Sequence, residues 1–302
     1  MTHNITVAAG DAIDINANGV TLDLNGFTIS STENPATTGD GISVGKDLKN
    51  ITIANGFIQG GVTNNGSGIY GGSGFGYGIF FSLDSTVAPA NVLVSGVSVS
   101  GCLGAGIFLN GDSQVVESCT VRTIGGYGIC ASVVKGCSAI DCGNHAISGY
   151  QISDCRGQCS GNGAGINSFG TVQNCYGVSG TYFGVYALNA QNCYGVSSNG
   201  NYTGLSATTA LNCYGLHGLT ATIAQNCYGY SANNASGLSA TTAQNCYGYS
   251  GGNGIGLSAV TATGCYGSSS SGTGLSALIA TGCHGVSTTG FALDVTHNLN
   301  SY

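Results

Sequence analysis

The sequence predicts an all-β solenoid in which coils of about 18–20 residues stack on one another, a length typical of short structural repeats. Two repeats that run in phase support this prediction. The first is a set of ten cysteines at a nearly constant interval, shortened once between Cys213 and Cys227: Cys119, Cys137, Cys155, Cys175, Cys193, Cys213, Cys227, Cys246, Cys265 and Cys283. The second is Gly-Leu-Ser-Ala at residues 204, 237, 256 and 274, with Gly-Leu-Thr-Ala at 218. A fixed period of this kind indicates one structural unit stacked on copies of itself, each too small to bury a core alone.

The repeat at residues 204–215 shows how one coil is built. Leu205 and Ala207 alternate with Ser206, the period of two that is typical of a strand with one buried face. Cys213 continues the inward set, so we expect the repeated cysteines to form a buried stack of small apolar side chains. A bend is expected at the Asn before each cysteine, because Asn tolerates turn conformations. These residues are Asn174, Asn192, Asn212, Asn226 and Asn245.

The N-terminal third follows the same pattern with longer coils. Residues 20–29 alternate around a turn at Asn25-Gly26, and residues 51–58 repeat this pattern. Following the glycine that precedes each strand gives thirteen or fourteen coils, or about 65 Å of solenoid at one strand spacing per coil. We therefore expect a single domain over residues 1–302. It has longer, irregular coils in 1–100, a glycine-rich aromatic insertion at 60–89, and regular coils in 101–302.

The segment Gly19-Val-Thr-Leu-Asp-Leu-Asn-Gly-Phe-Thr-Ile29 and the later Asn-Cys-x-Gly turns resemble coils of the pectate-lyase-like superfamily. The resemblance covers essentially the whole chain and implies a right-handed parallel β-helix. The six-residue apolar repeat of left-handed β-helices is absent. The superfamily holds lyases, hydrolases, epimerases and non-enzymatic surface proteins, so the resemblance leaves activity open. Its calcium-binding and Arg-x-Pro-x-x-Arg patterns are missing here, and no metal or cofactor is expected.

The same resemblance implies an extracellular or cell-surface location, because most members are secreted or surface-exposed. Met1-Thr2-His3 begins no signal peptide, which leaves a mature domain without its leader or a cytoplasmic protein. With 5 basic and 12 acidic residues and a net charge of −7, the chain is a poor match for nucleic acid or an anionic membrane surface. No apolar run reaches membrane-spanning length, so membrane insertion is not expected.

Cys142 and Cys159 follow repeated cysteines by five and four residues, which places them near each other on adjacent coils. Either a disulfide between them or two further core thiols fits this spacing.

Catalytic chemistry has one candidate cluster. A polysaccharide lyase needs a base and a cation that stabilises developing carboxylate charge. The candidates for these roles are Arg122, Lys135, Asp141, His145 and Arg156. The competing interpretation is surface pairing, because Glu117 and Lys135 both precede a repeated cysteine by two residues and are expected to stack as an ion pair.

A row of tyrosines follows the cysteines at Tyr176, Tyr194, Tyr214, Tyr228, Tyr247 and Tyr266. Outward rings in a row can stack on sugar faces or on a partner. The alternative is that the rings stack on one another and stabilise the sheet. The aromatic insertion at 60–89 is a second candidate binding element, with part of it expected in the core.

Together these observations favour a non-catalytic extracellular structural β-helix. We expect it to contact polysaccharide through the tyrosine row, or to associate with itself laterally or end to end, since neither terminus has a helical pattern that would cap the strands. The alternative is a polysaccharide lyase or glycoside hydrolase.

Overall fold

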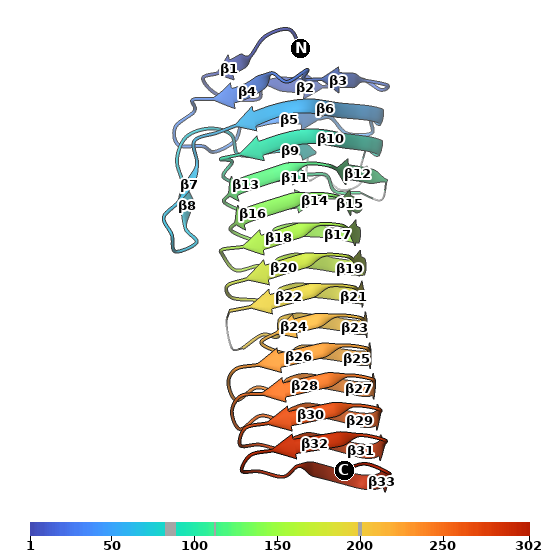
Figure 1. Ribbon diagram of the computed structural model, residues 1–302. Helices are drawn as coiled ribbons and strands as arrows, with labels where there is room; N and C mark the ends of the chain where they lie inside the picture. Colours follow the sequence, from blue (N-terminus) through green and yellow to red (C-terminus); the bar gives the residue numbers. More distant parts are fainter. Residues whose placement is uncertain (82–88, 112, 199–200) are drawn as a thin grey trace. The chain divides into compact units, whose positions relative to one another are not determined.

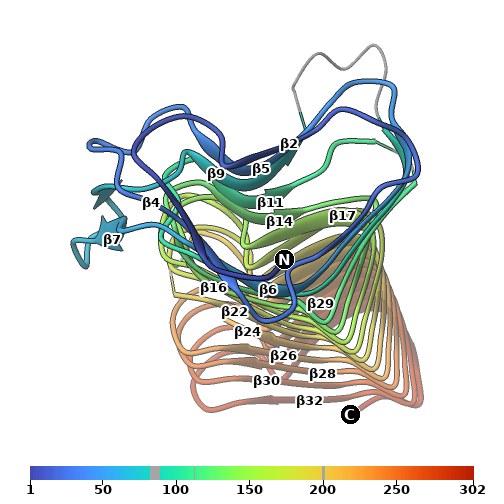
Figure 2. The same ribbon diagram turned by 90° about the horizontal axis from the view of Figure 1, so that it is seen from above.

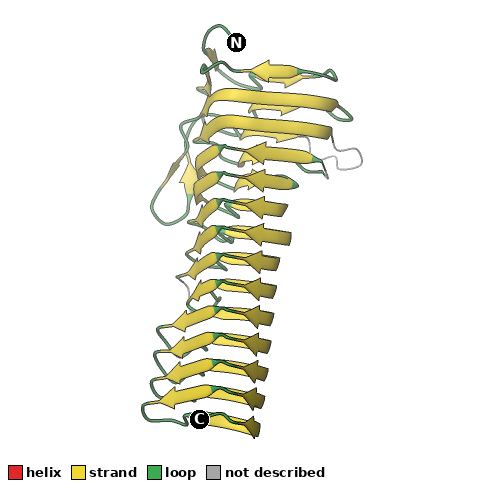
Figure 3. Ribbon diagram, turned by 45° about the vertical axis from the view of Figure 1, so that its right-hand side comes forward, coloured by secondary structure: helices red, strands yellow, loops and turns green. Residues whose placement is uncertain are grey.

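The computed structural model describes residues 1–81, 89–111, 113–198 and 201–302, and it contains strands and no helix within these ranges (Figure 3). It is a parallel β-solenoid with about 11 turns of about 19 residues between residues 92 and 299. The predicted fold class and coil length are thus confirmed. None of the described residues forms a helix that could cross a membrane. The chain divides into two compact units, Met1–Ser168 and Phe169–Tyr302, and β19 (Ile166–Gln173) contains the boundary.

The first unit consists of parallel strands in columns, with one antiparallel hairpin outside them (Figure 1). Its strands are β1 (Ile5–Val7), β2 (Ile13–Ile15), β3 (Thr21–Asp23), β4 (Thr28–Ser31), β5 (Asp40–Val44), β6 (Lys49–Gln59), β7 (Thr63–Asn64), β8 (Tyr70–Gly71), β9 (Tyr77–Phe81), β10 (Ala90–Ser100), β11 (Ala105–Phe108), β12 (Gln114–Glu117), β13 (Thr120–Ile124), β14 (Tyr127–Cys130), β15 (Val133–Lys135), β16 (Ser138–Cys142), β17 (Ile147–Ser153) and β18 (Arg156–Cys159).

Three columns of paired strands enclose the core of this unit (Figure 2). One column runs through β1, β4, β6, β10, β13, β16 and β18, and a second through β2, β5, β9, β11, β14 and β17. The third contains β3, the first halves of β6 and β10, and then β12 and β15. The long strands β6 and β10 have 11 residues each and turn a corner within one strand. Inward aliphatic side chains such as Ile53, Ile58 and Val94 are fully buried between the columns.

The aromatic insertion contributes to both the core and the surface. Residues 82–88 of the predicted 60–89 segment lie outside the described residues. Phe75 and Phe81 are completely buried, whereas β7 and β8 form a hairpin on the flank. The expectation that part of the insertion is core therefore agrees with the structure.

The second unit repeats one coil with two strands. Its strands are β20 (Tyr176–Ser179), β21 (Val185–Gln191), β22 (Tyr194–Ser197), β23 (Leu205–Leu211), β24 (Tyr214–Leu216), β25 (Leu219–Gln225), β26 (Tyr228–Ser231), β27 (Leu238–Gln244), β28 (Tyr247–Ser250), β29 (Leu257–Thr263), β30 (Tyr266–Ser269), β31 (Leu275–Thr281), β32 (His284–Ser287) and β33 (Leu293–Leu299). The odd-numbered strands from β21 form one column and the even-numbered strands form the other, with all pairs parallel.

The corner between the two strands of a coil is the predicted Asn. Asn192, Asn212 and Asn226 each have φ of 53°, in the left-handed region. Their side chains also form a ladder, in which Asn212 Nδ2 donates to Asn192 Oδ1 at 3.2 Å and Asn226 Nδ2 donates to Asn212 Oδ1 at 3.2 Å. Gly264 and Gly282 take over this corner with φ of 60°. The bend is therefore filled by the residue types for which this conformation costs least.

The cysteine stack is buried as predicted, with Cys213 and Cys227 only 3% and 2% exposed. The Cys213 thiol donates to the carbonyl oxygens of Ala190 at 3.4 Å and Leu211 at 3.2 Å. Hydrogen bonding with the Cys193 thiol, together with burial, raises the pKa of Cys213 to about 12, so it stays protonated. Cys142 and Cys159 are register partners, as their spacing suggested, but both are thiols and form no disulfide.

Candidate functional site

The tyrosine row of the second unit is a stack of parallel rings. Neighbouring ring centroids from Tyr194 to Tyr266 lie 4.6 to 4.9 Å apart, with interplanar angles of 1 to 9°. Tyr176 joins one end at 5.1 Å and His284 the other at 5.2 Å. Each interior ring therefore has another ring against both faces. Burial and the neighbouring phenols raise the pKa of Tyr214.

This geometry limits what the row can bind. A sugar stacks on an aromatic face, and the interior rings offer only their edges and hydroxyl groups. Tyr176, at 38% exposed, is the most open of the six, and the others are half-buried. Ring-on-ring stacking is thus the observed role of these side chains, and sugar binding by the row remains a prediction.

The five weak catalytic candidates do not converge on one point. Arg122 on β13 and Arg156 on β18 are exposed in one column of strands, whereas Lys135 lies on β15 in another. Lys135 is the register partner of Glu117, as predicted, although Glu117 Oε1 accepts its hydrogen bond from Ser95 Oγ at 3.4 Å.

His145 and Asp141 hold parts of the backbone and the hairpin in place. His145 Nδ1 accepts the Ala164 N–H at 2.8 Å, and burial lowers the pKa of its ring, so the imidazole is neutral. Asp141 Oδ1 accepts Asn64 Nδ2 at 2.6 Å and the Tyr70 hydroxyl at 2.8 Å, which docks the β7–β8 hairpin against the columns. Burial alone would raise the pKa of Asp141, but these hydrogen bonds hold it below its usual range.

The described residues offer no candidate metal site. Within these ranges, no group of three or more His, Cys, Asp and Glu side chains is placed to hold a metal ion.

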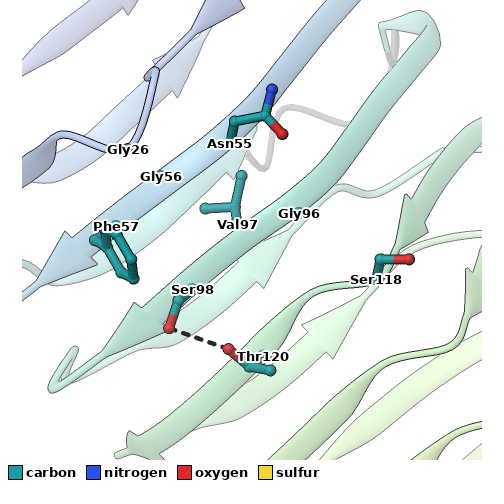
Figure 4. A pocket seen from close by; sticks show the side chains of 9 residues that line it. All are labelled: Gly26, Asn55, Gly56, Phe57, Gly96, Val97, Ser98, Ser118 and Thr120. Carbon is teal, nitrogen blue, oxygen red and sulfur yellow. Dashed lines mark hydrogen bonds between the residues drawn. The ribbon is translucent and has the colours of Figure 1, made fainter.

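The first unit has a hollow of about 230 Å³ at its corner, drawn in Figure 4. We name it the Phe57 hollow, and its lining is Gly26, Asn55, Gly56, Phe57, Gly96, Val97, Ser98, Ser118 and Thr120. No lining residue is charged. It forms because the corner residues of three successive coils, Asn55, Gly96 and Ser118, all have φ between 53 and 62° and carry small side chains.

Phe57 differs from the stacked tyrosines because its ring has an open face. Its register partner on β10 is Ser98, whose own partner on β13 is Thr120, so small hydroxyl residues follow the ring along the column (Figure 4). Phe57 is 48% exposed, and among the described residues no aromatic ring stacks on it. Thr120 Oγ1 and Ser98 Oγ lie 3.0 Å apart beside it. Asn55 also lines the hollow, and its Nδ2 donates to Asp23 Oδ1 at 3.3 Å.

The residues of the Phe57 hollow form no motif that the sequence alone would mark as a site. The available signal was the alternation at residues 51–58, because an inward Ile58 requires Phe57 to point outward.

Comparison of the chain with protein-family models, curated proteins and solved structures gave no match.

Proposed function

We propose that the protein is a non-catalytic surface β-solenoid of the pectate-lyase-like type that contacts neutral carbohydrate at the Phe57 hollow. The observation that supports this proposal is one open aromatic face beside an amide and three hydroxyl groups, with no charge in the lining. Aromatic rings contribute apolar contact to a sugar's C–H face, while amide and hydroxyl groups can bond its hydroxyls. An extracellular or cell-surface location is part of the same proposal.

The enzymatic alternative has less support from the geometry. A lyase or glycoside hydrolase needs its acid, base and charge-stabilising groups at one scissile bond. Arg122, Lys135 and His145 lie on different parts of the coil, and none of the five candidates lines the Phe57 hollow. Self-association remains a prediction, which electron microscopy across a concentration series tests.

The carbohydrate proposal is tested by Phe57→Ala. Binding to a panel of neutral polysaccharides is measured by affinity electrophoresis, and the retarding polysaccharide is taken forward. We expect Phe57→Ala to weaken its binding roughly tenfold, since a central aromatic contact typically dominates such a site. The matched control is Phe291→Ala, which removes a ring that is 74% exposed and outside the hollow.

Unchanged binding in Phe57→Ala, or equal losses in Phe57→Ala and Phe291→Ala, would overturn the proposal. The double variant Tyr194→Ala/Tyr228→Ala tests whether the polysaccharide binds at the tyrosine row instead. If it abolishes binding while Phe57→Ala does not, the contact lies on the tyrosine row.

A further inference from the structure

A second hollow in the first unit has a different chemistry. We name it the aromatic pocket; it measures about 300 Å³ and lies over β9, β11 and β14. Its lining is Tyr77, Phe80, Gly104, Ala105, Phe108, Gly126, Tyr127 and Asn144. It shares no residue with the Phe57 hollow and holds none of the catalytic candidates.

Four aromatic rings form the walls of this pocket. Tyr77 and Phe80 stack at a centroid distance of 4.1 Å, and Phe80 lies 6.0 Å from Phe108. Phe108 meets Tyr127 edge to face at 5.8 Å and 68°. Tyr77 and Phe80 are stacked at 26°, whereas Phe108 meets Phe80 at 36° and Tyr127 at 68°, so the four rings do not form the continuous parallel stack seen in the tyrosine row.

The floor of the pocket is Ala105, which interrupts a column of rings and is itself only 1% exposed. Ala105 is the register partner of Tyr77 on one side and of Tyr127 on the other, so a methyl group stands where the neighbouring coils carry a ring. The two glycines in the lining stand where neighbouring groups leave no room for a side chain. A Cβ on Gly104 would lie 2.9 Å from the Tyr77 ring, and one on Gly126 would collide with the Gly104 carbonyl oxygen.

The lining selects a neutral and mostly apolar ligand. It contains no charged residue, and its polar groups are the Tyr77 and Tyr127 hydroxyls and the Asn144 amide. Asn144 Oδ1 accepts the His145 N–H at 2.8 Å, which leaves its NH₂ group as the donor for a ligand. A pyranose would bring several hydroxyls to walls that are mainly hydrocarbon, and an unsatisfied buried hydroxyl is costly. An aromatic ring has no such requirement.

We propose that the aromatic pocket binds a neutral phenolic ring, which packs against Phe80, Phe108 and Tyr127 and directs its hydroxyl to the polar rim at Asn144. The pocket volume is at the lower end of the usual range for ligand sites, so it accommodates one or two rings. Offset and edge-to-face contacts with Phe80, Phe108 and Tyr127 supply the binding energy.

The test uses 4-fluorophenol as the probe and its ¹⁹F line width as the readout, at pH 7 where the probe is neutral. We expect saturable binding with a dissociation constant on the order of 1 mM, reasonable for so few heavy atoms. Ala105→Phe adds a ring on the floor of the pocket and is expected to weaken binding roughly tenfold. The matched control is Ser138→Tyr, which adds a ring after Cys137 at the position where Tyr176 follows Cys175. It should leave the affinity unchanged.

Circular dichroism establishes that each variant is folded. If Ala105→Phe does not fold, Phe108→Leu takes its place, because it removes one wall and leaves the floor intact, and the same tenfold loss is expected. The proposal is overturned if the probe does not bind, if Ala105→Phe leaves binding intact, or if Ser138→Tyr weakens it equally. Displacement of the probe by methyl β-glucopyranoside as readily as by p-cresol would also overturn it and identify a sugar site.

Discussion

At the scale of single residues, the left-handed corner is constrained by its backbone conformation. Asn212 has φ of 53° and links Asn192 and Asn226 through its side chain. An L-residue other than Asn or Gly costs about 1–2 kcal/mol in this conformation because Cβ crowds the following carbonyl. The side-chain ladder is exposed to solvent, so the hydrogen bonds contribute less than the backbone preference.

The first prediction compares two substitutions at this corner. Asn212→Ala should lower the free energy of unfolding by about 1–2 kcal/mol. Asn212→Gly, which copies the natural corners at Gly264 and Gly282, should cost about 1 kcal/mol less than Asn212→Ala. Urea denaturation followed by circular dichroism measures both. Equal losses would show that the ladder, and not the backbone angle, determines the corner.

At the scale of elements, the start of β5 contains a buried carboxylic acid. The Asp40 side chain is 6% exposed, and its Oδ1 has no hydrogen-bond partner among the described residues. Its backbone N–H donates to Asp11 Oδ1 at 2.8 Å, which brings a second carboxylate close. Burial and, after it, the charge of Asp11 raise the pKa of Asp40 to about 7.

This acid gives a pH-dependent stability with a defined sign. Because the pKa of Asp40 is raised on folding, the folded state binds more protons than the unfolded state between pH of about 4 and 7. Its favourable contribution is complete below the unfolded pKa and is lost as the pH rises through about 7. We therefore expect Asp40→Asn to be more stable than the native chain at pH 8, by about 1–3 kcal/mol.

Urea denaturation of both proteins at pH 5 and pH 8 measures this difference, which should shrink at the lower pH. Asp294→Asn, at an exposed aspartate, controls for the general loss of one negative charge. A constant difference between Asp40→Asn and the native chain at both pH values would rule out titration of Asp40 as the cause.

At the scale of the whole molecule, the sequence was sufficient to predict the features that repeat from coil to coil, and it was insufficient to predict those that occur once. Asn212 and Cys213 recur at a constant offset, so one coil predicts the corner and the core of the others. Tyr77, Ala105 and Tyr127 are unevenly spaced along the chain, because their coils differ in length. Their register, and hence the alanine between two tyrosines, follows from strand pairing that no period reveals.

The charged catalytic candidates also show what the repeat period does not predict, which is the position of a side chain within its coil. Lys135 and Arg156 are on neighbouring coils, so closeness along the repeat suggested closeness in space. Their positions within the coil differ, however, because Lys135 precedes a corner cysteine by two residues and Arg156 follows the next one. Because the corner lies between these two positions, Lys135 and Arg156 belong to different columns of strands. Their separation follows from the geometry of the bend.

If the coil is the unit of folding, its removal should be tolerated only in whole numbers. Deleting Tyr228–Cys246 removes one complete period and joins Cys227 to Tyr247, which preserves every inward position of the second unit. Nearest-neighbour stacking predicts a folded protein that loses the contribution of one coil.

Deleting Tyr228–Gly237 instead joins Cys227 to Leu238, which places a core leucine where an outward tyrosine stands. The shift moves the buried set to the solvent face, so this variant should lose the β-sheet circular dichroism of the coils after the junction and unfold less cooperatively. A folded half-coil variant would mean that the inward pattern does not hold the coils in register.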